Sequence, residues 1–143
     1  MRQKASQNKL SHWLIDSAGT GAWHVGEKPD RRSIATAKAH GIDISGQRAR
    51  QFTAHDFEQY DLILAMDRSN YNDILSLSAG ELQRNRVKLI LEAADPASAT
   101  TEVPDPYWDD NGFEQVYQML DEACEKIMQS MRHGHTLQPH WAE

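Results

Sequence analysis

Residues 60–70, which read YDLILAMDRSN, contain the pattern that decides the fold. The run 60–66 is almost continuously apolar, which is typical of a strand buried on both faces of a parallel sheet. Directly after it, the polar residues 67–70 open a helix that we expect to reach about Leu77, with Ile74 and Leu75 facing inward. The stretch therefore predicts one strand–helix unit of an α/β fold.

Further strand and loop patterns lie on both sides of this unit. The run 86–91 (RVKLIL) predicts the next strand, and 12–15 (HWLI) predicts an earlier strand followed by a glycine-rich loop at 16–21. A helical turn at 54–57 is expected to be capped by Thr53. The carboxyl ends of parallel strands share one edge, so the loops after residues 15, 66 and 91 should line the ligand site.

Three helices are predicted outside the central unit. Residues 2–10 resemble the back half of a helix, and 30–40 form a helix with Asp30 as its N-cap and Gly41 as its left-handed stop. The longest helix has one apolar stripe: Phe113, Val116, Tyr117, Leu120, Cys124, Ile127, Met128 and Met131. Alternating strands and helices of these lengths predict an α/β fold of three layers, a parallel sheet with helices on both faces.

Composition limits the possible functions. The chain has 143 residues and a formal net charge of −6, which disfavours a nucleic-acid backbone as partner. Cys124 is the single cysteine, so an internal disulfide and a Cys-rich zinc cluster are excluded. No signal peptide and no apolar run of membrane-spanning length is present, and we expect a cytoplasmic protein without a membrane partner. Six of the seven histidines show no metal-ligand spacing: His12, His24, His55, His133, His135 and His140.

The sequence at 103–108 (VPDPYW) is the strongest chemical signal. Pro104 and Pro106 fix the carboxylate of Asp105, and Tyr107 and Trp108 follow it directly. A rigidly held carboxylic acid beside aromatic side chains suits proton donation to a phenolic leaving group. A Pro-Asp-Pro turn alone is also an ordinary loop, so the motif needs its context.

That context is a set of motifs in a fixed order: LIDSAGT at 14–20, HGI at 40–42, RARQ at 48–51, LAMDRSN at 64–70 and the 103–108 stretch. Together they make the chain similar to the low molecular weight protein tyrosine phosphatases from residue 2 to about residue 134, leaving 135–143 as a polar tail. The resemblance implies a four-stranded parallel sheet and hydrolysis of phosphotyrosine through a cysteinyl-phosphate, without metal or other cofactor.

The resemblance also implies a phosphate-binding loop of Cys, five residues, Arg and Ser or Thr, which this sequence lacks. The residue six positions after Cys124 is Ser130, and Cys124 lies in the apolar stripe of the last helix, so we interpret it as a core residue. We therefore expect a chain truncated at its N-terminus, without the first strand and the start of the first helix. The missing strand would lie between the predicted strands at 12–15 and 60–66, which would leave an isolated monomer poorly folded.

The resemblance assigns roles to individual residues. Asp105 would be the general acid, Trp23, Tyr107 and Trp108 would form the substrate-binding aromatic slot, and Ser17 and Asp67 would support the phosphate-binding loop. Each has a plainer interpretation: Trp23 as a surface aromatic, Ser17 as a loop hydrogen-bonder and Asp67 as a helix cap. Gln47 departs from the family pattern, in which this position commonly holds His.

Three functions remain open. The first is a phosphatase whose nucleophile belongs to a longer chain, with a phosphotyrosine-containing protein or a small aryl phosphate as substrate, and a homodimer is possible. The second is a non-catalytic phosphatase-like binding module. The third is an arsenate reductase, but such enzymes of this fold pass oxidising equivalents along several cysteines, and one cysteine cannot form that relay.

Overall fold

The computed structural model describes residues 1–7, 13–106 and 111–132. Nine elements follow one another along these residues: α1 (Arg2–Gln7), α2 (Arg31–Ala39), α3 (Asp56–Gln59), β1 (Ile63–Ala65), α4 (Arg68–Ser76), α5 (Glu81–Arg84), β2 (Val87–Leu89), α6 (Ile90–Ala94) and α7 (Gly112–Arg132). The strands β1 and β2 pair in parallel, with Ile63 opposite Val87 and Ala65 opposite Leu89.

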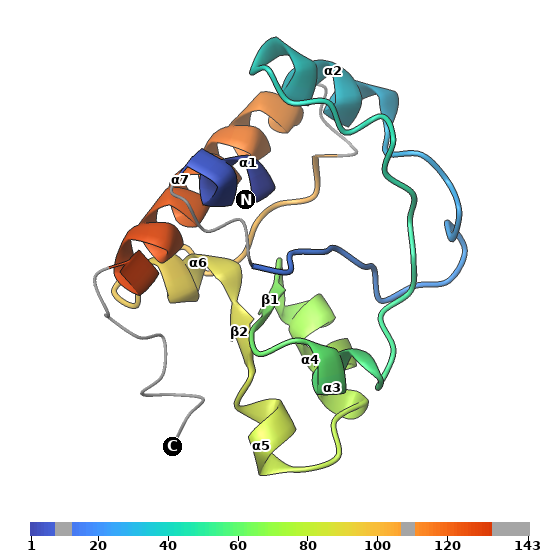
Figure 1. Ribbon diagram of the computed structural model, residues 1–143, viewed down its shortest axis with the longest axis vertical. Coiled ribbons are helices and arrows are strands. Elements are labelled where there is room, and N and C mark those ends of the chain that lie inside the picture. The colour runs from blue at the N-terminus through green and yellow to red at the C-terminus, as the bar shows by residue number, and fades with distance from the viewer. Residues whose placement is uncertain (8–12, 107–110, 133–143) are drawn as a thin grey trace.

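The sheet separates two apolar clusters, because successive side chains of a strand point to opposite faces. On one face, Ile63, Ala65, Val87 and Leu89 pack with Phe52, Phe57 and Ile74, beneath α3 and α4. On the other face, Leu64 packs against the cluster of α6 and α7, whose buried members include Leu91, Val103 and Ile127. Helices lie on both sides of the sheet (Figure 1), which confirms the predicted three-layer α/β architecture.

The last helix, α7, packs on the face of the sheet that Leu64 occupies. α7 contacts α1, α2 and α6, and Ile127 and Met128 on its apolar stripe are almost completely buried. Cys124 is 8% exposed, which agrees with its interpretation as a core cysteine. At one end of α7, Glu114 hydrogen-bonds His40 at 2.7 Å, and the His40 ring stacks on Tyr117. These contacts fix the end of α2 against α7.

Local signals in the sequence predicted several helix ends correctly. Asp30 caps α2 by accepting the Arg32 N–H at 2.8 Å, and Gly41 follows the helix with a φ of 80°. Asp67 caps α4 by accepting the Asn70 N–H at 2.8 Å. The helix predicted at 2–10 is present as α1 over Arg2–Gln7, and residues 8–10 lie outside the described part of the chain.

The strand predicted at 12–15 is wrong over its described residues. Residues 13–15 form no strand, and Leu14 is 71% exposed. A strand needs a neighbour for its backbone groups, and within the described residues this region has only one isolated parallel bridge, between Gly19 and Gln51. The described sheet accordingly has two strands.

Two smaller predictions also need correction. Residues 90 and 91 belong to α6 and not to the strand, because a short apolar run does not distinguish a buried strand from a buried helix. Thr53 does not cap α3 with its side chain; its N–H donates instead to the Asp56 carboxylate at 2.9 Å. The predicted end of the last helix at Gly134 and the tail at 135–143 lie outside the described residues.

Candidate active site

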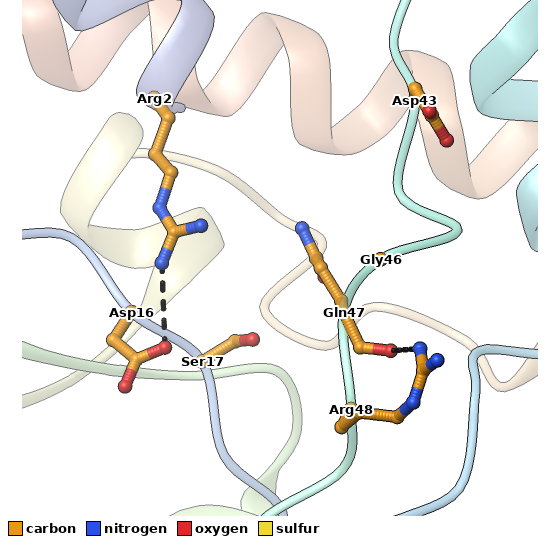
Figure 2. A pocket seen from close by; sticks show the side chains of 7 residues that line it. All are labelled: Arg2, Asp16, Ser17, Asp43, Gly46, Gln47 and Arg48. Atoms are coloured by element: carbon orange, nitrogen blue, oxygen red, sulfur yellow. Dashed lines mark hydrogen bonds and ion pairs between the residues drawn. The ribbon is translucent and has the colours of Figure 1, made fainter.

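A polar pocket of about 350 Å³ lies between α1, the loop after residue 15 and the segment that follows α2. Figure 2 shows its lining, which comes from three separate parts of the chain: Arg2, Asp16, Ser17, Asp43, Gly46, Gln47 and Arg48. Ser17, for which the resemblance implied support of the phosphate-binding loop, and Gln47, which departs from the family pattern, both line this pocket. Arg2 was not predicted, since nothing in the sequence distinguishes it from other surface arginines.

The carboxylate of Asp16 is the centre of this pocket's hydrogen bonding. Arg50 Nε donates to Asp16 Oδ2 at 3.0 Å, and Arg2 Nη2 lies 3.4 Å from Oδ1, as Figure 2 shows for Arg2. The Tyr60 hydroxyl lies 3.5 Å from Oδ2. The Ser17 backbone N–H, followed by the charges of Arg50 and Arg2, holds the pKa of Asp16 below its ordinary value of 3.8. The loop that carries Asp16 and Ser17 is therefore held by hydrogen bonds to the ionised carboxylate of Asp16.

Arg50 connects this loop to the interior. Its Nη1 donates to Asp56 Oδ2 at 3.1 Å, and Asp56 is the one charged residue that is buried among the described residues. The same carboxylate accepts the Thr53 N–H, so its desolvation is offset by two donors. Backbone bonds add to this link, since Gly19 N–H donates to Arg50 O at 2.9 Å and Phe52 N–H to Gly19 O at 2.7 Å.

The N-terminus of α4 joins two loops at the carboxyl end of β1. Asn70 Nδ2 lies 3.3 Å from Thr20 Oγ1, which connects the helix to the loop that carries Ser17. The Val103 N–H donates to Met66 O at 2.8 Å, which connects the end of β1 to the segment before Asp105. Contacts at this end of β1 therefore join the loop that carries Ser17 to the segment before Asp105.

The other candidate residues lie outside the polar pocket or outside the described residues. Asp105 is exposed between Pro104 and Pro106 and belongs to no helix or strand. Trp23 is 84% exposed, and a Cβ at Gly21 would come within 3.3 Å of its ring, so the indole lies over that glycine. Tyr107 and Trp108 lie outside the described residues.

No metal or membrane signal is found in the described residues. Within 1–7, 13–106 and 111–132, no three His, Cys, Asp or Glu side chains are grouped so that they could bind a metal ion. In the same part of the chain, no helix has both the length and the apolar character needed to cross a membrane.

The ionised state of Asp16 makes a contribution to stability that depends on pH. Because its pKa is lower in the folded chain, the contribution is present above about pH 3.8 and is lost as the pH falls through the folded pKa. The pairs are partly exposed, so we expect the contribution to be about 0.2–1 kcal/mol. Urea unfolding of Asp16→Asn from about pH 5 to about pH 2 should give a flatter profile than that of the parent chain. Asp61→Asn, at an exposed aspartate, is the control, and parallel profiles for Asp16→Asn and the parent would contradict the assignment.

The fold defines a class, the three-layer α/β proteins built on a parallel sheet with helices on both faces. The particular family follows from comparison, since the family model for low molecular weight phosphotyrosine protein phosphatases matches residues 1–137. The chain belongs to that family.

Relatives and solved structures agree with this assignment. The low molecular weight phosphotyrosine protein phosphatase of Sus scrofa is 36% identical over 128 residues, which cover 88% of this chain and 79% of the relative. The crystal structure of a protein tyrosine phosphatase from Entamoeba histolytica matches with a TM-score of 0.85 at 29% identity, covering 94% of this chain and 86% of that one. The crystal structure of YfkJ from Bacillus subtilis matches with a TM-score of 0.83 at 32% identity, covering 94% and 84%.

Proposed function

We propose that this chain provides the acid–base residue and the aromatic substrate slot of a protein tyrosine phosphatase, and that the nucleophile is not among its 143 residues. The observation that carries the proposal is the junction at the N-terminus of α4. There, Asn70 Nδ2 donates to Thr20 of the Ser17 loop, and Met66 O accepts the N–H of Val103 in the segment before Asp105, so both segments lie at one edge of the sheet. In open α/β sheets, ligands bind outside the carboxyl ends of the strands, where these two segments meet.

In the proposed reaction a cysteine thiolate attacks the phosphorus of an aryl phosphate while the bond to the phenolic oxygen breaks. Asp105 donates its proton to that oxygen, so the leaving group departs as a neutral phenol. In the second step the Asp105 carboxylate accepts a proton from the attacking water, and the phosphorus–sulfur bond breaks to give inorganic phosphate and the thiolate. Its exposed position in a turn fixed by two prolines leaves Asp105 accessible to substrate.

The other residues receive supporting roles in this proposal. Trp23, with Tyr107 and Trp108, would hold the aromatic ring of a phosphotyrosine-containing protein or of a small aryl phosphate. Ser17 and Asp67 would hydrogen-bond the phosphate-binding loop, with Asp16 and Arg50 keeping Ser17 at the pocket. The reaction needs no metal, and we place it in the cytoplasm, with a homodimer as a possible assembly.

Cys124 is a poor candidate for the nucleophile. It is 8% exposed within α7, and the residue six positions later is Ser130, so no arginine of the required spacing stabilises a thiolate or a transferring phosphoryl group. On this account the 143-residue chain alone is inactive. A non-catalytic binding module with the same aromatic slot is the second candidate, because it needs the slot and no nucleophile.

Translation of the coding frame upstream of Met1 distinguishes the phosphatase from the non-catalytic binding module. The DNA immediately before the codon for Met1 is read in frame, and the chain is expressed with the residues it encodes. If the proposal is right, the added residues include Cys, five residues, Arg and Ser or Thr, and the longer chain hydrolyses phosphotyrosine. A frame without this motif, or a longer chain that binds phosphotyrosine without hydrolysing it, would favour the binding module.

A further inference from the structure

Asp105 lies between two prolines, Pro104 and Pro106. Pro104 and Pro106 have no N–H, so neither can donate a hydrogen bond to the rest of the fold. The residues directly before Pro104 connect the segment to the rest of the fold. Val103 is 7% exposed within the cluster of α6 and α7, and its N–H donates to Met66 O at 2.8 Å.

Glu102 adds a second connection directly beside the first. The residue is exposed, yet its Oε1 accepts the Arg68 backbone N–H at 2.7 Å, across 34 residues of sequence. Arg68 is the first residue of α4, and the first N–H groups of a helix have no partner within the helix. A carboxylate at that position is also favoured by the helix dipole.

The same helix end is already capped by Asp67, which accepts the Asn70 N–H at 2.8 Å. The bond from Glu102 is therefore not needed to provide α4 with a cap. Since Asn70 Nδ2 also lies 3.3 Å from Thr20 Oγ1, the residues at this end of α4 contact both the Glu102 segment and the loop that carries Ser17. A displacement of Glu102 would change where Asp105 lies relative to that loop.

We infer that Glu102 is a positioning residue, which acts through the N-terminus of α4 to fix residues 102–106 and so the Asp105 carboxylate at the site. This inference rests on the proposed role of Asp105 as the general acid. Glu102 itself touches no reacting atom. Its function is to hold the segment that carries Asp105.

Amide hydrogen exchange on the 143-residue chain tests the inference without any measurement of activity. In Glu102→Ala the Val103 N–H should exchange about tenfold faster, relative to the core N–H of Ile63, although its own bond to Met66 O is untouched. Glu102→Gln keeps an oxygen that can accept the Arg68 N–H, so it should restore most of the protection. Glu81→Ala, at an exposed glutamate in the first turn of α5, should leave Val103 unchanged.

Faster exchange at Arg68 alone, with Val103 unaffected in Glu102→Ala, would show a helix cap without a positioning role and would overturn the inference. An equal loss in Glu102→Gln and Glu102→Ala would also overturn it, because the accepted bond would not be the cause. If Glu102→Ala does not fold, Glu102→Asp removes one methylene and carries the same expectation for Val103. None of these results depends on whether Asp105 is the acid. Hydrolysis rates of Asp105→Asn on aryl phosphates with different phenols decide that question separately.

Discussion

Replacement of Asp105 by Asn, in a longer chain that carries the nucleophilic loop, is expected to slow hydrolysis of aryl phosphates with poor leaving groups by ~10²-fold or more. A phenol of high pKa cannot depart as its anion, so its departure depends on a proton supplied in the transition state. Asparagine has nearly the same shape and can hydrogen-bond the oxygen, but it cannot transfer a proton. The turn between Pro104 and Pro106 should keep its conformation in the variant.

A series of aryl phosphates with phenols of decreasing pKa measures the effect. The loss should shrink as the leaving group improves, because a stable phenolate needs no proton. Asp73→Asn, at an exposed aspartate on α4, provides a matched loss of charge and should leave the whole series unchanged. Equal losses across the series in Asp105→Asn would mean that Asp105 positions the substrate without donating a proton.

Features determined by neighbouring residues could be predicted from the sequence. The apolar stripe of α7, the N-caps Asp30 and Asp67 and the left-handed Gly41 depend on contacts within a few residues, and the structure has all of them. The order of the family motifs also predicted the fold class. The local pattern was enough in these cases because capping and helical periodicity are local interactions.

Features that depend on distant partners could not be predicted. An apolar run becomes a strand only when another strand accepts its hydrogen bonds, and in the described residues the chain around Leu14 has no such neighbour. The link from Asp16 through Arg50 to Asp56 joins residues up to 40 positions apart, and the bond from Glu102 to Arg68 spans 34. Nothing in the spacing of these residues indicates that they meet.

The second large effect concerns the 143-residue chain itself, which is expected to hydrolyse no aryl phosphate above background. A general acid without a nucleophile cannot form the cysteinyl-phosphate, and the one cysteine is buried in α7. The residue six positions after Cys124 is Ser130, so no arginine stands at the spacing needed to hold a transferring phosphoryl group. We therefore expect the proposed acid, Asp105, to have no nucleophile with which to act.

The most direct measurement is the steady-state release of a chromogenic phenol by the purified 143-residue chain and by its Cys124→Ser variant, side by side. Both proteins are expected to stay at the rate of the buffer. A steady rate that is abolished in Cys124→Ser would show that Cys124 is the nucleophile despite its burial. A steady rate that survives in Cys124→Ser would show that this chain hydrolyses phosphate esters without a cysteine, and the proposed mechanism would be wrong.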